Sequence, residues 1–469
     1  MSFPDRIRHI HLIAVCGTGM GSLAGLLQSK GFVVTGSDQN IYPPMSLELE
    51  KLGIRLMSGY SPENLKKKAD LVVVGNVVSK TNPEVLEMIR KNIPYCSMPD
   101  ALAHFFMQNN RSIVVAGTHG KTTTSAVIAH LLLKMGNDPS FLVGGVLQDS
   151  QKNYRIGRGP YFVIEGDEYD TAFFDKGPKF LHYKPCYTIV TSLEFDHADI
   201  YRDLDHLTES FVRLLETNDP KGFVLACTHY PRLMEILTKS ASPVETYGFS
   251  DGSTWNAGKF SFEGGKTSFD ILYRSRREVR MESPLAGRHN ILNVLAAYAL
   301  LQKLGFKADP IQEALRTFKG IKRRQEVLGV VNDIVVMDDF AHHPTAIRET
   351  VDAVKRKYSG YKIWSVFEPR SNTSKRDIFR KEFARSFGGS DFVILADVFM
   401  PEKGTNGKIL DVDRLASDIE KSGILARHIS GVETIVDTLK KEVTPPAVIL
   451  IMSNGGFGGI HKKVLESLK

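Results

Sequence analysis

The chain has 469 residues, of which 42% are hydrophobic and 24% are charged, a composition typical of a soluble globular protein with room for about three domains. No apolar run approaches the ~20 residues that cross a bilayer, and the N-terminus lacks a secretion pattern, so we expect no membrane insertion. Four cysteines without disulfide or metal spacing favour a cytoplasmic location. Anionic small substrates explain the net charge of +7 as well as nucleic acid does, and because the basic residues are dispersed we expect no nucleic-acid partner.

The first part of the chain alternates predicted strands with a predicted helix. Apolar strands are expected over residues 9–15, 32–36 and 71–75, and a helix over residues 22–29. Strands that alternate with helices form parallel sheets with helices on their faces. The pattern therefore predicts an α/β fold that begins with a Rossmann-like sheet.

A glycine loop separates the first predicted strand from the helix. Gly17 and Gly19 allow a phosphate to approach the backbone closely, and Ser37 and Asp38 follow the second strand, where an acidic group can meet a ribose or a base. The dinucleotide-binding fingerprint needs a glycine at position 22, which is Ser22 here. NAD therefore stays open as a ligand, but another nucleotide-like ligand is favoured.

Residues 116–124 read Ala-Gly-Thr-His-Gly-Lys-Thr-Thr-Thr and lie between the apolar strand 112–115 and a predicted helix. Backbone N–H groups at such a helix start face an anion, and Lys121 adds a positive charge. Thr122 or Thr123 can place a hydroxyl on Mg²⁺. The loop is shorter than the common phosphate-loop pattern, which would place its first glycine at position 115. The motif predicts binding of ATP or GTP.

Carboxylates and a histidine follow two further predicted strands. Glu165 follows the strand at 161–164, and a segment that contains His197 follows the strand at 187–193. Because sites in open α/β sheets lie at the carboxyl ends of the strands, we expect these groups to converge on the phosphate loop. Mg²⁺ at a triphosphate prefers carboxylate oxygens, and a histidine can bind a second cation. Either group alone could be a helix cap, but together with the loop they predict a metal and nucleotide site.

The last third of the chain begins another α/β pattern with a predicted strand over residues 334–337. His342 and His343 follow this strand. Adjacent side chains rarely face one site, so we expect these histidines to be structural or to orient substrate rather than to bind a metal. A polar segment at 367–373 and a glycine loop at 453–459 come next, and the glycine loop could hold a carboxylate or form a tight turn.

These motifs, in this order, resemble the Mur ligases, ATP-dependent enzymes that form amide bonds in bacterial peptidoglycan synthesis. The resemblance covers essentially the whole chain. It implies an α/β fold with a Rossmann-like N-terminal domain, a central P-loop ATPase domain and a Rossmann-like C-terminal domain. The expected boundaries, for binding of the UDP-sugar, of ATP and of the amino acid or peptide in that order, are residues 1–108, 109–322 and 323–469.

The resemblance also implies roles for individual residues. The nucleotide would be bound by Gly117, Thr118, His119, Gly120, Lys121, Thr122 and Thr123, by Asn290 on the adenine side, by Arg324 at the terminal phosphate and by Asp339 at the ribose and the hinge. The implied Mg²⁺ ligands are Thr122, Glu165 and His197. The implied catalytic residues are Lys121, Glu165, His197 and Arg324. The implied substrate contacts are Gly17, Gly19, Ser37 and Asp38 for the UDP group, together with His343, Arg370 and Asn372.

One departure from the family pattern narrows the implied substrate. Members that add the second and later peptide residues carry a lysine soon after the metal histidine, whereas residues 198–220 contain none. This absence resembles the branch that extends the lactyl carboxylate of UDP-N-acetylmuramate, with either L-alanine or a recycled tripeptide. Tyr169 and Ala198 resemble the tripeptide-adding members, since a serine and a methionine are expected there in the alanine-adding ones. Arg370 would then bind a peptide carboxylate; the alternative is an ion pair with Glu368 or another surface acid.

The implied activity is that of an ATP-dependent ligase in peptidoglycan recycling. ATP would phosphorylate the muramate carboxylate, and the amine of the murein tripeptide L-alanyl-γ-D-glutamyl-meso-diaminopimelate would attack the acyl phosphate. His343 or His197 could assist loss of the amine proton. The alternatives are a UDP-N-acetylmuramate–L-alanine ligase, a catalytically inactive nucleotide-binding regulatory protein and, more weakly, a dinucleotide-dependent oxidoreductase. We expect a monomer or homodimer whose C-terminal domain closes when ATP binds.

Overall fold

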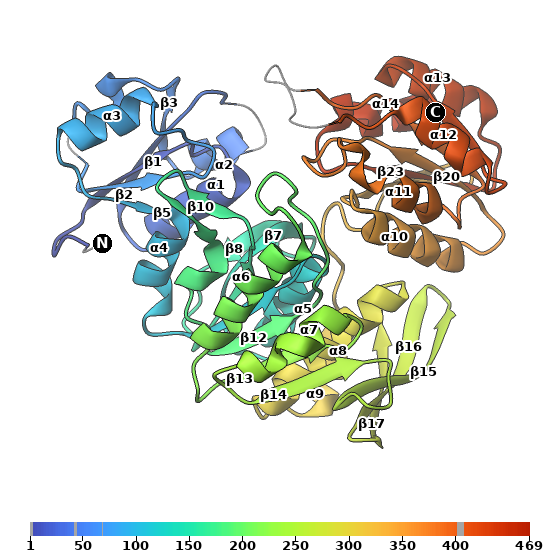
Figure 1. Ribbon diagram of the computed structural model, residues 1–469, viewed down its shortest axis with the longest axis horizontal. Helices are drawn as coiled ribbons and strands as arrows, with labels where there is room; N and C mark the ends of the chain where they lie inside the picture. The colour runs from blue at the N-terminus through green and yellow to red at the C-terminus, as the bar shows by residue number, and fades with distance from the viewer. Residues whose placement is uncertain (1–2, 42–44, 68, 401–407) are drawn as a thin grey trace. The chain divides into compact units, whose positions relative to one another are not determined.

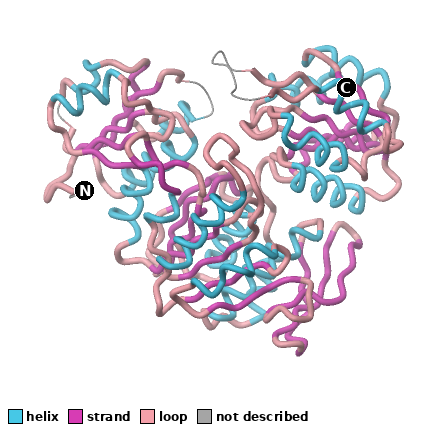
Figure 2. The backbone as a smooth tube through the Cα atoms, in the orientation of Figure 1, coloured by secondary structure: helices cyan, strands magenta, loops and turns pink. Residues whose placement is uncertain are grey.

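The computed structural model describes residues 3–41, 45–67, 69–400 and 408–469. The backbone divides into two compact units, and Figures 1 and 2 trace its helices and strands. Unit 1 consists of Met1–Val146, Gln151–Leu193 and Asp205–Thr246. Unit 2 consists of Leu147–Ser150, Glu194–Leu204 and Tyr247–Lys469. Across the described ranges, no helix is both long enough and apolar enough to cross a membrane.

Unit 1 begins with a parallel sheet, drawn in blue in Figure 1, whose strands follow the order β3-β2-β1-β4-β5. The strands are β1 (His9–Ile13), β2 (Val33–Asp38), β3 (Arg55–Ser58), β4 (Leu71–Val74) and β5 (Tyr95–Ser97). The helices are α1 (Thr18–Ser29), α2 (Met45–Lys51), η1 (Pro62–Leu65), α3 (Pro83–Arg90), α4 (Met98–Leu102) and η2 (Ala103–Met107). All four residues of β4 are buried, because a parallel sheet is covered on both faces, and its sequence is therefore continuously apolar.

The predicted Rossmann-like sheet is confirmed, but the prediction of its first helix was wrong at the start. The first strand ends at Ile13 because Ala14 has a φ of 67°, and α1 begins at Thr18 rather than at residue 22. The backbone N–H of Gly21 donates to the carbonyl of Gly17 over 2.8 Å, so the glycine loop itself forms the first helical turn.

A second sheet in unit 1 carries the phosphate loop. Its strands in this unit follow the order β14-β13-β12-β6-β9-β7-β8, and β6 is paired in parallel with β9 and β12. The strands are β6 (Arg111–Ala116), β7 (Ser140–Leu147), β8 (Lys152–Arg155), β9 (Tyr161–Gly166), β12 (Tyr187–Val190), β13 (Phe223–Cys227) and β14 (Val244–Gly248). The helices are α5 (Lys121–Lys134), η3 (Lys179–His182), α6 (Leu204–Thr217), α7 (Pro231–Ile236) and η4 (Leu237–Lys239). Because β6 lies inside the sheet, every residue after Arg111 in this strand is buried.

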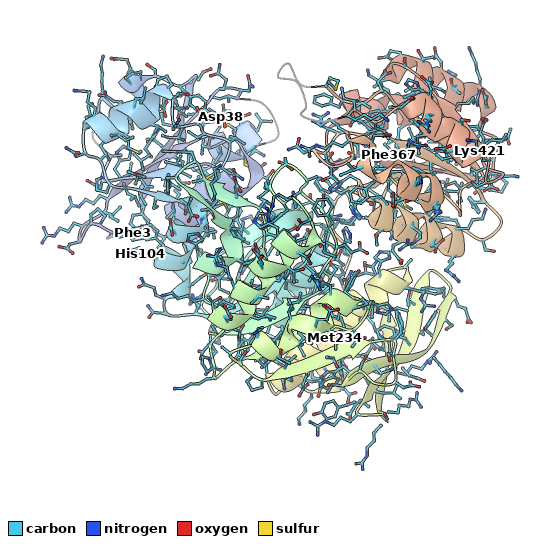
Figure 3. All side chains as sticks on the ribbon, in the orientation of Figure 1. Phe3, Asp38, His104, Met234, Phe367 and Lys421 are labelled. Atoms are coloured by element: carbon cyan, nitrogen blue, oxygen red, sulfur yellow. The ribbon has the colours of Figure 1, made fainter. Side chains whose placement is uncertain are left out.

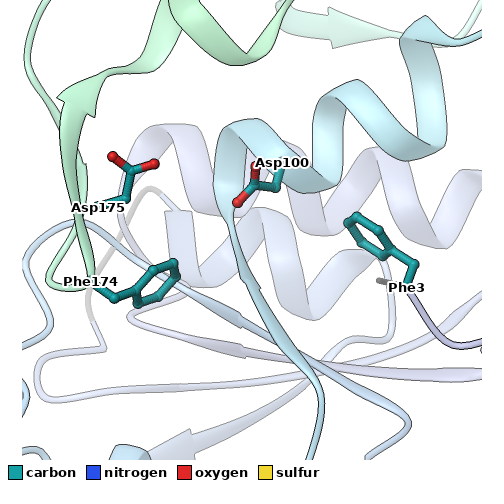
Figure 4. A pocket seen from close by; sticks show the side chains of 4 residues that line it. All are labelled: Phe3, Asp100, Phe174 and Asp175. Carbon is teal, nitrogen blue, oxygen red and sulfur yellow. The ribbon is translucent and has the colours of Figure 1, made fainter. Parts of the chain in front are cut away.

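A small antiparallel hairpin, β10 (Asp170–Ala172) and β11 (Asp175–Pro178), contacts the first sheet within unit 1. The ring of Phe174 at its turn packs edge-on against Tyr95, with 5.1 Å between the ring centres. His182 lies 2.7 Å from Asp100 and 3.0 Å from Asp175. A cavity of about 260 Å³ at this junction is lined by Phe3, Asp100, Phe174 and Asp175, which Figure 4 shows from close by.

Unit 2 begins with an antiparallel meander and two helices. The strands are β15 (Trp255–Glu263), β16 (Lys266–Tyr273) and β17 (Arg276–Ser283), and the helices are α8 (Arg288–Lys303) and α9 (Ala308–Arg316). The α8 helix is buried along most of its length, and Gly287, with a φ of 102°, precedes its first residue. A residue with a Cβ would be strained at that φ, which is why a glycine stands before this helix.

The second sheet of unit 2 has the strand order β18-β19-β23-β20-β21-β22, and only β18 is antiparallel to its neighbour. The strands are β18 (Glu326–Val331), β19 (Ile334–Asp339), β20 (Lys362–Phe367), β21 (Phe392–Leu395), β22 (Leu425–His428) and β23 (Ala447–Met452). The helices are α10 (Pro344–Lys357), η5 (Asp377–Phe379), α11 (Arg380–Ser386), α12 (Val412–Glu420), α13 (Val432–Glu442), η6 (Phe457–Gly459) and α14 (Ile460–Ser467).

Alternate residues of β23 pack into two separate hydrophobic clusters, one on each face of this sheet. Val448 and Leu450 belong to one cluster, and Ile449 and Ile451 belong to the other. Phe367, labelled in Figure 3, belongs to the first cluster. Because side chains alternate along a strand, a sheet covered on both faces needs apolar residues at every position, and β23 has them.

Candidate active site

The phosphate loop joins β6 to α5 through two glycines with positive φ. Gly117 has a φ of 132° and Gly120 has a φ of 81° directly before the first residue of α5. A Cβ at Gly117 would lie 2.7 Å from the backbone nitrogen of Ser192. The Ser192 hydroxyl in turn accepts from the backbone N–H of His119 over 2.7 Å, and the Thr191 hydroxyl donates to the His119 carbonyl. The end of β12 therefore holds the loop at the start of a 14-residue helix, where an anion is favoured.

Lys121, the first residue of α5, is held by opposite charge. Its side chain is 12% exposed, and its Nζ donates to the Glu168 carboxylate over 2.8 Å and 3.1 Å and to the Gly117 carbonyl over 2.6 Å. Burial alone would lower the pKa of Lys121, but the charges of Glu168 and Asp167 outweigh burial and raise it. Lys121 is therefore a fixed positive charge at the phosphate loop.

Thr122 and Glu165 place two oxygens side by side. The Thr122 hydroxyl donates to Oε2 of Glu165 over 3.0 Å, and Oε1 of Glu165 accepts from the backbone N–H of Gly144. A hydroxyl and a carboxylate at a helix start are hard oxygen donors, so the pair fits the chemistry of Mg²⁺. His197, the third predicted ligand, lies in unit 2, whereas Thr122 and Glu165 lie in unit 1.

The acidic segment after β9 also surrounds Tyr169. The Nζ of Lys179 lies 4.1 Å from the centre of the Tyr169 ring and 3.3 Å from Asp167. Burial, followed by the charge of Asp167, raises the pKa of Tyr169 well above its usual value. Tyr169 is therefore a neutral, half-buried phenol next to the residues that hold Lys121.

The glycine loop of the first sheet is tied to the end of β2. Asp38, labelled in Figure 3, accepts from the backbone N–H of Cys16 over 2.8 Å. Gly19 lies close to Met98, since a Cβ there would come within 3.0 Å of its terminal methyl. Ser37 is fully buried, and its hydroxyl donates to Glu84 over 2.5 Å. The structure thus gives Ser37 a structural role, and its predicted contact with substrate stays a prediction.

Arg324 and Asp339 lie together in unit 2, where the chain enters β18. The Arg324 guanidinium is 5.0 Å from the centre of the Phe340 ring. The carboxylate of Asp339 is buried and accepts from the backbone N–H groups of Gln325 and Ala341, each over 2.8 Å. Burial raises the pKa of Asp339, and the charge of Arg324 opposes this rise. The carboxylate fixes the segment that carries Arg324, and the predicted contacts of Asp339 with the ribose and the hinge and of Arg324 with the terminal phosphate stay predictions.

Asn290 lies in the first turn of α8 and is buried. Its Nδ2 donates to the Ala286 carbonyl over 2.7 Å, and its Oδ1 accepts from Asn293 over 3.1 Å. The neighbouring His289 lies 3.7 Å from Glu349 on α10. Asn290 is therefore rigidly held, and its predicted contact with adenine stays a prediction.

The segment that contains His197 docks against the loop after β20, within unit 2. The Thr373 hydroxyl donates to Asp196 over 2.5 Å, and Asn372 donates to Asp199 over 2.9 Å. The guanidinium of Arg376 donates to the Ala198 carbonyl over 2.7 Å. These hydrogen bonds join two segments about 170 positions apart in the sequence. The segment with the predicted metal histidine, His197, and the loop with the predicted peptide contact Asn372 are therefore held together as one structural element.

Asp196 is the buried centre of this element. Burial alone would raise its pKa, but electrostatic interaction with the neighbouring imidazoles of His197, His342 and His343, together with the Thr373 hydroxyl, lowers it. His197 has a φ of 53°, and its backbone N–H donates to the Asp196 carboxylate over 2.7 Å. The side chain of Asp196 therefore holds the backbone at His197 in a conformation that is rare for residues other than glycine.

The two adjacent histidines have separate partners. Nδ1 of His343 accepts from the backbone N–H of Thr345 over 3.3 Å, so His343 caps α10, and Nδ1 of His342 lies 2.9 Å from the Phe340 carbonyl. A structural role, as predicted, is therefore present for both, whereas the predicted contact of His343 with substrate stays a prediction.

Arg370 is held in a compact cluster. Its guanidinium stacks on Phe399, with 3.5 Å to the ring centre, and lies 3.6 Å from Glu368. The Glu368 ion pair that stood as the alternative interpretation is thus present. The side chain is 28% exposed, and Gly455 packs directly against it.

The structure brings Lys121, Thr122 and Glu165 together in unit 1, and it places the remaining predicted catalytic residues, His197 and Arg324, in unit 2. Three further residues complete these arrangements and were not assigned from the sequence: Glu168, Asp196 and Thr373. The signal for Glu168 and Asp196 was their position within a few residues of the carboxyl ends of buried strands, β9 and β12. Thr373 lies in the polar segment predicted to supply peptide contacts, but nothing in the local sequence pointed to its hydrogen bond with Asp196.

A buried parallel strand, a glycine turn and a lysine in the first helical turn define a P-loop type of α/β nucleotide-binding protein. Three family models match the chain. They are described as Mur ligase family, catalytic domain, over residues 9–109; Mur ligase middle domain over 115–301; and Mur ligase, glutamate ligase domain, over 323–455.

Similar proteins extend over the whole chain. The UDP-N-acetylmuramate–L-alanyl-γ-D-glutamyl-meso-2,6-diaminoheptandioate ligase of Escherichia coli K12 is 38% identical, covering 98% of each chain. The UDP-N-acetylmuramate–L-alanine ligase of Carboxydothermus hydrogenoformans is 34% identical, covering 97% of this chain and 96% of that protein. A crystal structure of a murein peptide ligase from Psychrobacter arcticus has a TM-score of 0.73 and 36% identity, with 98% of each chain covered.

The chain belongs to the Mur ligase family. The predicted three-domain α/β architecture and the predicted enzyme class, a ligase, are confirmed. The boundaries predicted at residues 108 and 322 stay predictions.

Proposed function

We propose that this chain joins the carboxylate of UDP-N-acetylmuramate to the amine of L-alanyl-γ-D-glutamyl-meso-diaminopimelate, with ATP as the phosphoryl donor. The observation that carries the proposal is the 38% identity, over 98% of each chain, to a ligase named for these substrates. Tyr169 and Ala198, and the absence of lysine from residues 198–220, favour the tripeptide over L-alanine as the acceptor.

The phosphate loop supports the first step, in which the γ-phosphoryl group moves from ATP to the muramate carboxylate and ADP leaves. Backbone N–H groups at the start of α5 and the fixed charge of Lys121 suit the migrating phosphoryl group. Arg324 would add a second charge at the terminal phosphate. Thr122, Glu165 and His197 would hold Mg²⁺, which supplies charge neutralisation at the phosphates when bound.

The element around Asp196 supports the second step. The peptide amine attacks the acyl carbon, the carbon–oxygen bond to phosphate breaks, and the amine loses a proton. Asp196 positions the backbone at His197, and Thr373 and Asn372 connect that segment to the loop that carries Arg370. This connection supports a peptide site on the third predicted domain, residues 323–469. The cytoplasmic location and the monomeric or homodimeric state stay predictions.

The test is an amine-dependent phosphate-release assay with ATP, UDP-N-acetylmuramate and either the tripeptide or L-alanine. We expect kcat/KM for the tripeptide to exceed that for L-alanine, and we expect Lys121→Ala to abolish phosphate release while binding of the UDP-sugar persists. A higher kcat/KM with L-alanine would establish the alanine-adding alternative instead.

A further inference from the structure

A second cavity, of about 290 Å³, lies in unit 2 beside the segment that contains His197. Glu194 and Phe195, which directly precede Asp196, form one side, and His343 at the start of α10 forms another. Residues around α11 close it: Phe379, Glu382 and Arg385. Of the predicted substrate contacts in this unit, Arg370 and Asn372 lie on the loop after β20 and His343 lines the cavity, whereas α11 carries none.

The floor of the cavity is aromatic. The ring of Phe379 packs edge-on against His343, with 5.2 Å between ring centres, and lies 6.2 Å from the ring of Phe195. His343 is itself buried and lies 4.0 Å from Glu194. Such a surface fits a short aliphatic chain, because aromatic rings gain contact area from methylene groups.

The rim carries both signs of charge. Arg348 and Arg385 are exposed and positive, and Glu382 is exposed and negative. Among the described residues, Arg385 and Glu382 make no ion pair within 4.0 Å, and the contact of Arg348 with its neighbour Glu349 spans 3.8 Å. Arg385 and Glu382, of opposite sign beside aromatic side chains, are complementary to a zwitterionic group on an aliphatic chain.

We propose that this cavity binds the distal end of the acceptor peptide, an ammonium and a carboxylate on an aliphatic side chain, with Arg385 on the carboxylate and Glu382 on the ammonium. This assignment rests on the proposed function, in which the peptide ends in meso-diaminopimelate. A single L-alanine carries no such group, so the cavity would separate the tripeptide from L-alanine at a point remote from the reacting amine.

The experiment compares two tripeptides that differ at the distal end: L-alanyl-γ-D-glutamyl-meso-diaminopimelate and its analogue ending in L-lysine, which keeps the distal amine and lacks the carboxylate. Arg385→Met should raise KM for the diaminopimelate peptide by about ten- to hundredfold and leave KM for the lysine peptide unchanged. Glu382→Gln should raise KM for both peptides. Neither variant should change KM for ATP or UDP-N-acetylmuramate.

Lys381→Met is the matched control, because Lys381 is an exposed cation on the same helix and does not line the cavity. It should behave as wild type with both peptides. A wild-type KM for the diaminopimelate peptide in Arg385→Met, or an equal rise for both peptides in that variant, would overturn the assignment of the cavity. A wild-type enzyme that ligates L-alanine and neither tripeptide would overturn the proposed function itself.

Discussion

The buried ion pair between Lys121 and Glu168 gives the sharpest stability prediction. The two side chains are 12% and 1% exposed, and their charged atoms approach to 2.8 Å. In Glu168→Gln the ammonium would stay buried and would contact only neutral acceptors, the Gly117 carbonyl and the new amide oxygen, in place of the Glu168 carboxylate. Removal of one partner from a buried pair costs about 3–5 kcal/mol. For a domain of about 150–250 residues, that is a fall in Tm of about 6–20 °C.

A variant that replaces both residues distinguishes the cost of an unpaired buried charge from the cost of lost packing. Replacement of both charges, as Lys121→Met with Glu168→Leu, leaves no charge buried, and such replacements are often neutral or stabilising. We therefore expect the double variant to melt well above Glu168→Gln. Differential scanning calorimetry of Lys121→Met, Glu168→Leu and the double variant gives the coupling energy directly.

A surface pair in the same unit provides the control. Lys176 and Asp170 are similarly close, with 2.7 Å between their charged atoms, but Lys176 is 67% exposed. Asp170→Asn should cost about 1 kcal/mol or less, because solvent screens an exposed pair. If Glu168→Gln melts at the same temperature as Asp170→Asn, or if the effects of the two single variants simply add, the argument that Lys121 depends on a buried counter-charge is refuted.

Three further predictions concern the loop, the metal and pH. Gly117→Ala should abolish nucleotide binding, whereas Gly136→Ala, also at positive φ but with open space around it, should not; equal nucleotide titrations would contradict this. Glu165→Gln and His197→Ala should each lower turnover by roughly tenfold or more, and a Mg²⁺ titration unchanged in both would rule out a metal site. His182, whose pKa is raised by Asp100 and Asp175 against the effect of burial, should stabilise the protein fully below about pH 6.5 and lose this effect as pH rises through its folded pKa; Tm of wild type and His182→Gln should therefore converge at high pH.

Local patterns were enough to predict the phosphate loop. The loop and its flanking elements lie within one stretch of chain: a continuous apolar run, two glycines, a lysine and an apolar helix. Their conformations depend mainly on residues close by in the sequence. The start of α1 was missed for a related reason. Glycines weaken a helix, so Gly19 and Gly21 were interpreted as a loop, whereas the structure uses them as the first turn.

The contacts that hold the site could not be read in the same way. Thr373 and Asp196 are 177 residues apart, and no periodicity links positions that distant. Asp338 and Asp339 show that the partners of adjacent residues in one strand could not be predicted from the sequence either. Arg323 pairs with Asp338 over 3.2 Å, while Asp339 accepts from backbone N–H groups. Adjacent residues of a strand face opposite ways, but the sequence does not say which face meets the linker.

Each unit contains an ionisable side chain whose charged form burial disfavours and neighbouring groups stabilise. Burial disfavours the charged forms of Lys121 in unit 1 and of Asp196 in unit 2, and in each case neighbouring groups oppose that effect: the carboxylates of Glu168 and Asp167 for Lys121, and nearby histidines with the Thr373 hydroxyl for Asp196. A group fixed in this way needs little reorganisation when charge develops on a substrate, which is the basis of electrostatic preorganisation. The same arrangement makes each group dependent on its neighbours, so removal of Glu168 or Thr373 should impair function without any contact between that residue and the substrate.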